Sequence, residues 1–481
     1  MKQFFTLIAI SILLSQQSAG QTLISAQHVG SVSKLQLEQQ FLLPFHNGVD
    51  RYRVTYTTKD IDGSPTIASG LVCLPDDFTK RYPVLCYQHG TSGTPADVPS
   101  NLSFEANFPV ALCGQGYVSF APDYLGLGVS QGIHPYVHAA SEAWVAADLL
   151  LATLDFAAQK FVEVNDQLFI TGYSQGGHAA MAFHRMVELE MADDFTVTAS
   201  APMSGPYSIG EVMRDLILSE EEYGRPGYLI NTIVSFQYVY GDLFSSFEEA
   251  FRPAYVEVVE QFWNGEITLN AVDVALANLL MAEEGAIVPL KLLREEYVAE
   301  VTGNPDHPAN LRMAENNTYD WAPQAPTRLI YCLADEEVPY KNSTLADSVM
   351  NDNGAADVMS INISSTSNHF NCVVVAANAM IDFFKNYQII EEAPLSATER
   401  HLAGLRIVPN PASGRVVVAD LPYSGGVLRL FDMQGREMLQ APTGGAHAKL
   451  DLTSLPDGLY VLVFSGPEGS RREKLAVRKG F

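Results

Sequence analysis

Short apolar runs and amphipathic segments alternate through the first 205 residues. Two-residue alternation predicts a strand in RYRVTYTTK, and two more strands follow in IASGLVCLP and PVLCYQHG. Helical periodicity with few breaking residues predicts a helix in SEAWVAADLLLATLDFAAQKF. A strand, a sharp turn and a helix are expected in QLFITGYSQGGHAAMAFHRMVELE. This order of elements predicts a mostly parallel sheet with crossover helices.

The pattern changes between residues 206 and 326, where mainly helical segments rich in Tyr, Phe and Leu occur. The alternation resumes with the strand of TRLIYCLAD and continues to about residue 390. We therefore expect an α/β domain over residues 21–390, interrupted at 206–326 by a helical insertion. An insertion that follows a strand is placed to form a cap over a site at the strand ends.

The last 90 residues differ from the rest in pattern and in charge. Residues 391–404 are expected to be a linker, and short strands with turns over 405–481 predict a small β-sandwich. Residues 401–481 carry a net charge of +3, whereas the first 400 residues carry −29. The acidic body disfavours nucleic acid and anionic membranes as partners.

The N-terminus has the features of an export signal. Lys2, the apolar run from Phe4 to Leu14 and the small residues Ser18 and Gly20 predict a signal peptide over residues 1–20. The apolar run is too short to span a bilayer comfortably, and no other stretch looks transmembrane. We expect a protein that is exported through the periplasm.

The cysteines give no metal-ligand spacing, and no metal or cofactor is expected. There are five of them, namely Cys73, Cys86, Cys113, Cys332 and Cys372. Export makes a disulfide possible, and the pair Cys332 and Cys372 near two catalytic candidates is one option. Buried free thiols are the other option, and the sequence leaves both open.

The pattern Gly-x-Ser-x-Gly occurs twice, around Ser174 and around Ser130. Ser174 follows an apolar strand and precedes a helix, which is the context of a nucleophile elbow. Ser130 has loop residues on both sides. We therefore predict Ser174 as the nucleophile. Its neighbour Gln175 has a backbone N–H where a developing oxyanion would lie.

A serine nucleophile needs a base and an orienting carboxylate, which follow it in the order acid and then histidine in this type of sheet. His369 lies in a loop before the last helix of the α/β domain, unlike the other histidines after Ser174, which are His178, His184, His307, His401 and His447. Asp335 ends a predicted strand, with Glu336 and Glu337 as rivals. A solvated His369 and a surface ion pair for Asp335 are the alternatives. The loop after PVLCYQ offers Gly90 and Thr91 as a second oxyanion donor, or else a tight loop without a ligand.

These motifs resemble the α/β-hydrolase superfamily, and within it secreted bacterial esterases and the secretory lipase family. The residues that carry the resemblance are GYSQGGHAA, PDYLGLG with HPY after it, and DEEVPY, within about residues 40–390. The resemblance implies a triad of Ser174, Asp335 and His369, with Gln175 and the Gly90–Thr91 region as the oxyanion hole. It also implies that the insertion is the lid region of such lipases.

The tail carries a second resemblance, to the C-terminal sorting domain of type IX secretion substrates. It rests on IVPNPASGRVVV, LRLFDMQGREM, LPDGLYVLVF and KLAVRK. It implies passage across the outer membrane by that secretion machinery, and a secreted or cell-surface location. An immunoglobulin-like binding module is the alternative for the tail.

Together these observations predict a secreted serine hydrolase that cleaves small-molecule or lipid carboxylic esters through an acyl-enzyme. A serine peptidase of the prolyl-oligopeptidase type and an inactive surface-binding protein are the alternatives. Most aromatic side chains of the insertion are expected to pack in its own core, and the remainder to line an acyl pocket. The aromatics considered are Tyr228, Phe236, Tyr238, Tyr240, Phe244 and Trp263.

Overall fold

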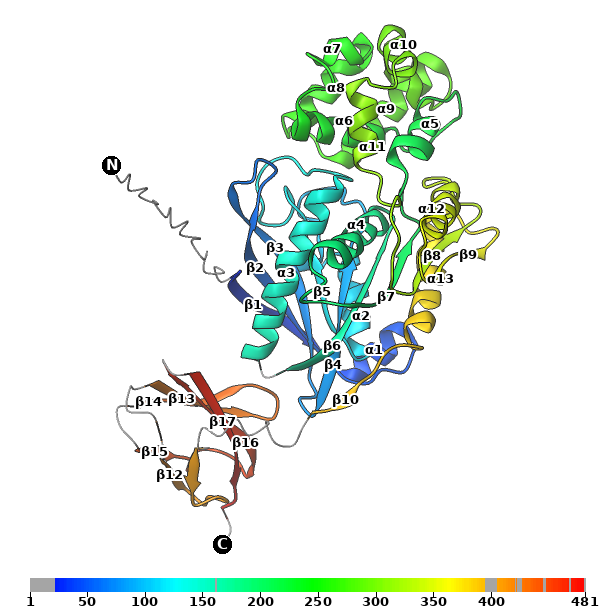
Figure 1. The fold of residues 1–481 in the computed structure, drawn as a ribbon. Coiled ribbons are helices and arrows are strands. Elements are labelled where there is room, and N and C mark those ends of the chain that lie inside the picture. The colour runs from blue at the N-terminus through cyan, green and yellow to red at the C-terminus, as the bar shows by residue number, and fades with distance from the viewer. Residues whose placement is uncertain are drawn as a thin grey trace, which may run out of the picture. The chain divides into compact units, whose positions relative to one another are not determined.

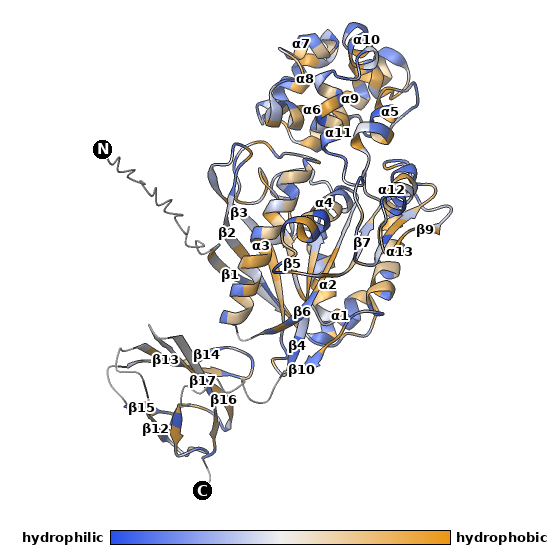
Figure 2. Cartoon of the chain, in the orientation of Figure 1, coloured by the Kyte–Doolittle hydropathy of each residue, from blue (hydrophilic) through white to orange (hydrophobic). Residues whose placement is uncertain are grey.

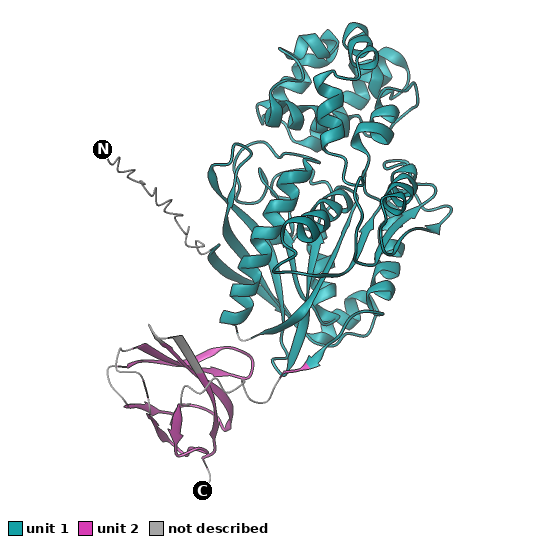
Figure 3. Ribbon diagram, in the orientation of Figure 1, with its two compact units in different colours: residues 1–391 teal, residues 392–481 magenta. Residues whose placement is uncertain are grey.

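The structure is a computed structural model that describes residues 22–160, 162–393, 405–419, 421, 426–443, 447–466 and 469–479. The chain forms two compact units, residues 1–391 and residues 392–481 (Figure 3). The expected signal peptide at 1–20 and most of the expected linker at 391–404 lie outside the described residues. Within the described ranges, every helix is too short or too polar to span a bilayer.

A ten-stranded sheet forms the centre of the first unit (Figure 1). Its strands are β1 (Leu23–Val32), β2 (Val49–Lys59), β3 (Pro65–Pro75), β4 (Lys80–Gln88), β5 (Val118–Pro122), β6 (Glu163–Tyr173), β7 (Val197–Met203), β8 (Thr327–Cys332), β9 (Val358–Ser364) and β10 (Glu391–Glu392). The order is β1-β2-β3-β5-β4-β6-β7-β8-β9, and β10 pairs with β4.

The strands from β5 to β9 in this order are parallel, as the alternating pattern predicts. The strands β1, β2 and β3 are antiparallel to their neighbours. A short turn joins β2 to β3, and a parallel crossover needs a dozen residues or more. The expectation of a mostly parallel sheet therefore holds for its centre, and its first edge is an antiparallel addition.

Helices cover both faces of the sheet (Figure 1). They are α1 (Lys34–Phe41), α2 (Asn107–Gly114), α3 (Ala139–Gln159), α4 (Gln175–Glu190), α12 (Lys341–Asp352) and α13 (His369–Phe384). Val84 and Cys86 of β4 join a core with α3 and α4, whereas Leu85 and Tyr87 join a core with α2 and α13. Successive residues of β4 thus face opposite cores, which explains why this strand is apolar along its length.

The expected helical insertion leaves the sheet after β7 and returns at β8, and it forms a cap. Its helices are the π-helical turn η3 (Ile209–Met213), α5 (Arg214–Ile217), α6 (Pro226–Tyr240), α7 (Phe247–Ala250), α8 (Pro253–Trp263), α9 (Leu269–Glu284), the 3₁₀ turn η4 (Pro289–Leu292), α10 (Glu295–Gly303) and α11 (Pro308–Glu315). Each long helix carries hydrophobic and hydrophilic residues (Figure 2). Their apolar sides form a core of their own, with Val234, Val259 and Leu276 fully buried.

The second unit is a small all-β domain, as predicted. Its strands are β11 (Arg406–Val408), β12 (Arg415–Ala419), β13 (Gly426–Asp432), β14 (Glu437–Thr443), β15 (His447–Asp451), β16 (Gly458–Gly466) and β17 (Gly469–Val477). They form two antiparallel sheets, β11-β12-β15 and β14-β13-β16-β17. Val416 and Leu450 of one sheet share a core with Leu428 and Leu462 of the other, so the domain is a sandwich.

Candidate active site

Ser174 occupies the sharp turn between β6 and α4. Its backbone has a φ of 59° and a ψ of −123°, a conformation that non-glycine residues adopt only with strain. Two glycines make the turn possible. A Cβ on Gly172 would collide with the carbonyl of Gly176, and a Cβ on Gly176 would collide with the carbonyl of Gln88. The strain and the crowding are those of a nucleophile elbow.

Ser174, His369 and Asp335 form one hydrogen-bonded row. The Nε2 atom of His369 lies 2.9 Å from Oγ of Ser174, and its Nδ1 atom lies 2.9 and 2.8 Å from the two oxygens of Asp335. A carboxylate accepts hydrogen bonds, so Nδ1 carries the proton and Nε2 is free to accept the serine proton. The structure therefore brings together the three residues that the sequence singles out.

The two rival carboxylates have other partners. Glu336 accepts a hydrogen bond from the backbone N–H of His369, at 2.9 Å. Glu337 accepts one from Nε of Arg225 at 2.8 Å, and its other oxygen lies 3.9 Å from Nε2 of His369. Asp335 is held in place because its Oδ1 also accepts from the backbone N–H groups of Glu337 and Val338.

His369 is the first residue of α13 rather than a loop residue, because Asn368 caps this helix by accepting from the N–H of Asn371. Burial lowers the pKa of His369, but the hydrogen bond and charge of Asp335, with the charges of Glu337 and Glu336, raise the pKa above its ordinary value of 6.5. The site therefore stabilises the imidazolium that forms when His369 takes a proton.

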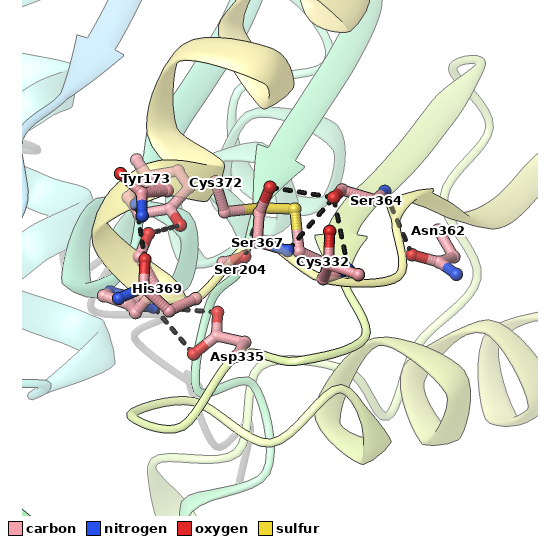
Figure 4. The surroundings of a disulfide bond; sticks show 12 residues. Tyr173, Ser204, Cys332, Asp335, Asn362, Ser364, Ser367, His369 and Cys372 are labelled. Atoms are coloured by element: carbon pink, nitrogen blue, oxygen red, sulfur yellow. Dashed lines mark hydrogen bonds and ion pairs between the residues drawn. A yellow bond between two sulfur atoms is a disulfide. The ribbon is translucent and has the colours of Figure 1, made fainter.

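A disulfide joins Cys332 to Cys372 (Figure 4). It ties the end of β8, just before the turn that carries Asp335, to the first turn of α13, which begins with His369. Of the two options left open by the sequence, this pair is bonded. Cys73, Cys86 and Cys113 are buried free thiols.

Of the predicted oxyanion donors, Gln175 directly follows Ser174 and Gly90 lies close to it. Gln175 begins α4, so its backbone N–H has no acceptor within the helix. Gly90 is close to Ser174, since a Cβ added to it would lie 3.9 Å from Cβ of Ser174. The backbone N–H of Gly90, however, interacts with the carboxylate of Glu105 and is therefore already used. The N–H of Thr91 is the remaining candidate on this side, and its Oγ1 lies 3.2 Å from the hydroxyl of Tyr136.

An apolar pocket between the elbow and the cap has Ser174 in its wall. Its lining is almost wholly aliphatic and aromatic, from Tyr136, Val137, Pro206, Val338 and the cap helices η3, α5, α6, α10 and α11. Of the six cap aromatics considered, Tyr228 and Phe236 line it. Phe244, Tyr240 and Trp263 pack in or against the cap core. Ser130 lies in a loop, where its Oγ accepts from the N–H of Gly126.

Sequence reasoning missed a buried polar cluster beside Ser174. Its members are Glu142, His134, Gln175 through its side chain, His178 and Asn316. One signal was available, because Glu142 is one of two acids in the otherwise apolar segment SEAWVAADLLL, and a buried charge needs a partner. No group of side chains in the described ranges has the composition of a metal site.

Residues 406–478 match the family described as "Secretion system C-terminal sorting domain". The tail is therefore a type IX secretion sorting domain, and the protein is secreted or held at the cell surface. No curated protein sequence matches the chain significantly.

The first unit is similar to several solved structures. The rice cell wall degrading esterase LipA from Xanthomonas oryzae is 26% identical, with a TM-score of 0.69 over 77% of this chain and 98% of that chain. A Legionella pneumophila protein is 28% identical, with a TM-score of 0.69 over 76% and 98%. Candida antarctica lipase A in its closed state shares the fold alone, at 14% identity and a TM-score of 0.55 over 79% and 86%. The first unit thus has the α/β-hydrolase fold.

Proposed function

We propose that this chain, an α/β-hydrolase with a type IX secretion sorting domain, is a secreted carboxylic ester hydrolase that uses Ser174, His369 and Asp335 as its catalytic triad. The observation that carries the proposal is the continuous row of hydrogen bonds from Ser174 through His369 to Asp335. The similarity to an esterase from Xanthomonas oryzae over nearly its whole length favours an ester as the substrate.

In the proposed reaction, Nε2 of His369 takes the proton of Ser174 as Oγ attacks the ester carbonyl carbon. The N–H groups of Gln175 and Thr91 donate to the oxygen that becomes negative. The C–O bond to the alcohol then breaks, and His369 returns the proton to the leaving alcohol. Water hydrolyses the acyl-enzyme by the same steps, and Asp335 holds the imidazole in the required tautomer throughout.

The proposed substrates are esters with a medium or long acyl chain. The pocket at Ser174 is apolar, and it offers an acyl chain many aliphatic and aromatic contacts. An acetyl group would leave most of these contacts unused, so acetate esters should be poorer substrates.

The test is a panel of p-nitrophenyl esters of increasing chain length, with peptide amides included, assayed with the full chain and with Ser174→Ala. Esters should be cleaved, amides should not, and Ser174→Ala should lose roughly 10⁶-fold in kcat. Ser130→Ala is the matched control, since it removes the serine of the same sequence pattern in a loop, and it should remain active.

A fluorophosphonate label that attaches to Ser174 separates this proposal from an inactive binding protein. Cleavage of amides at rates like those of esters would favour a peptidase instead. Ester hydrolysis that survives in Ser174→Ala would rule out the proposed nucleophile.

A further inference from the structure

Three polar side chains beside the elbow are almost wholly buried, yet the proposed reaction does not use them. Glu142 is 1% exposed, and Gln175 and His178 are 0% exposed. Polar groups buried in this way lower stability unless they are paired. Their partners therefore indicate what the cluster holds in place.

The side-chain amide of Gln175 is fixed by two acceptors. Its nitrogen lies 2.8 Å from Oε1 of Glu142 and 2.8 Å from Nε2 of His134. Nδ1 of His134 donates to the carbonyl of Leu125, and burial lowers the pKa of His134 to about 4, so the ring is neutral and Nε2 accepts. Both amide hydrogens of Gln175 are therefore used, and the amide has one possible orientation.

His178 anchors the other oxygen of Glu142. Its Nδ1 lies 2.7 Å from Oε2 of Glu142, and its Nε2 lies 2.9 Å from the carbonyl oxygen of Asn316. A carbonyl only accepts, so Nε2 donates there and one proton is shared between Nδ1 and Glu142. Asn316 in turn accepts from the N–H of Ala139 at the start of α3. The cluster thus joins the start of α4 to the start of α3.

We propose that Glu142 and His178 are positioning residues for ester hydrolysis, which hold Gln175 so that its backbone N–H points at the oxyanion. The inference rests on the proposed function. The first N–H groups of a helix have no helical acceptor to fix their direction, and Ser174 before them is strained. An oxyanion donor must lie within a few tenths of an ångström of its required place. The anchored side chain of Gln175 supplies that constraint.

Glu142→Ala leaves the Gln175 amide and the His178 ring without their shared acceptor. We expect kcat to fall roughly 10- to 100-fold, less than the loss of a whole oxyanion donor, with KM changed by less than about twofold. The affinity for an alkylboronic acid, whose adduct with Ser174 is tetrahedral, should fall by the same factor as kcat. Glu142→Gln should recover most of kcat and most of the boronic acid affinity. The new amide oxygen accepts from Gln175, and the new amide nitrogen donates to a neutral His178.

Glu188→Ala is the matched control, on the helix α4 that carries Gln175 and His178. Glu188 binds Nε2 of His184 at 2.9 Å and accepts from the N–H of Ala325, so this change also removes a carboxylate that pairs with a histidine of α4. It should lower the melting temperature and leave kcat per titrated active site unchanged. Gln175→Ala keeps the backbone N–H of residue 175 and removes only the side-chain amide that anchors it. This variant provides the same test if Glu142→Ala does not fold.

The inference is supported if kcat and boronic acid affinity fall together in Glu142→Ala or Gln175→Ala but not in Glu188→Ala. It is overturned if kcat per active site is unchanged in Glu142→Ala and Gln175→Ala, or if kcat falls in them without loss of boronic acid affinity. It is also overturned if Glu188→Ala loses kcat and boronic acid affinity to the same extent. The wild-type chain decides the proposed function separately, because a wild type that neither cleaves esters nor reacts with a fluorophosphonate at Ser174 contradicts that function itself.

Discussion

Both carboxylate oxygens of Asp335 lie within 2.9 Å of Nδ1 of His369, so the imidazole has a single tautomer. Asp335→Asn places an amide there, which can donate to Nδ1 and move the ring proton to Nε2. Such a ring cannot accept from Ser174, and we expect kcat to fall roughly 10⁴-fold. Steady-state kinetics measures this. Glu336→Gln keeps an acceptor for the N–H of His369 and should cost far less; equal losses would remove Asp335 from the triad.

The pH dependence of kcat/KM should report the raised pKa of His369. The base must be neutral, so activity falls as the pH drops through this pKa, above 6.5. Glu337→Gln removes a negative charge 3.9 Å from Nε2 and should move the acid limb to lower pH. Arg225→Gln removes the cation paired with Glu337, so it should move the acid limb of the profile to higher pH. Shifts of the same sign in both variants would contradict this assignment.

The same pKa has an opposite consequence for stability. A histidine whose pKa is raised by folding stabilises the native state below its unfolded pKa, and this contribution is lost as the pH rises through the folded pKa. His369 therefore stabilises the fold most at acid pH, where it is inactive as a base. Urea unfolding of wild type and His369→Gln across this range should show their difference in free energy of unfolding shrinking as the pH rises.

Loss of the Cys332–Cys372 disulfide should reduce both stability and activity. The bond spans 40 residues, and the chain-entropy relation assigns it about 4 kcal/mol. The double variant Cys332→Ser, Cys372→Ser should lose about that free energy of unfolding, and kcat should fall because β8 and α13 are no longer tied. Dithiothreitol should inactivate wild type and Cys86→Ala but not change the double variant. Equal stability of wild type and double variant would contradict the expectation.

A larger side chain in the cap pocket should shorten the preferred acyl chain. Ile233 of α6 lines the pocket, and Ile233→Trp should lower kcat/KM for octanoate relative to butyrate by roughly 10-fold or more. Val274 of α9 is 61% exposed and outside the lining, so Val274→Trp is the control and should leave the chain-length profile unchanged. A profile that neither change affects would show that the cap serves packing alone.

Deletion of residues 405–481 should separate catalysis from export. The family match at 406–478 and the separate core of this domain imply that the first unit folds without it. The truncated protein, once purified, should keep the kcat of the full chain, while the native cell should retain it. Activity assays on culture supernatant and on cell lysate measure this. Normal appearance outside the cell would contradict the sorting role.

The residues that the structure brings together could be singled out from the sequence where their placement depends on local order along the chain. Ser174 is a recognisable candidate because strand, turn and helix are contiguous, Asp335 because it follows a strand, and His369 because it stands at the start of the last helix of the α/β domain. The antiparallel edge formed by β1, β2 and β3 was not predicted, since the direction of pairing depends on strands that are distant in sequence.

The surroundings of Gln175 could not be predicted for the same reason. Its amide partners His134 and Glu142 precede it by 41 and 33 positions, and Asn316 belongs to the far end of the cap. Glu142 stands out in its own segment as an acid among apolar residues, whereas His134 and Asn316 do not stand out in theirs. The disulfide was left open because pairing requires a distance, and only the fold brings the end of β8 to the first turn of α13.

The bond between Cys332 and Cys372 should also make the protein less active before the bond has formed. Thiols remain reduced in the cytosol, and disulfides form in the oxidising compartments beyond it. A chain that is destined for the exterior therefore forms this bond, which joins the segments that carry Asp335 and His369, only after it has left the cytosol. With Asp335 and His369 as the proposed acid and base, we expect newly made copies to be poorer catalysts than mature ones, which would spare the esters of the producing cell during synthesis.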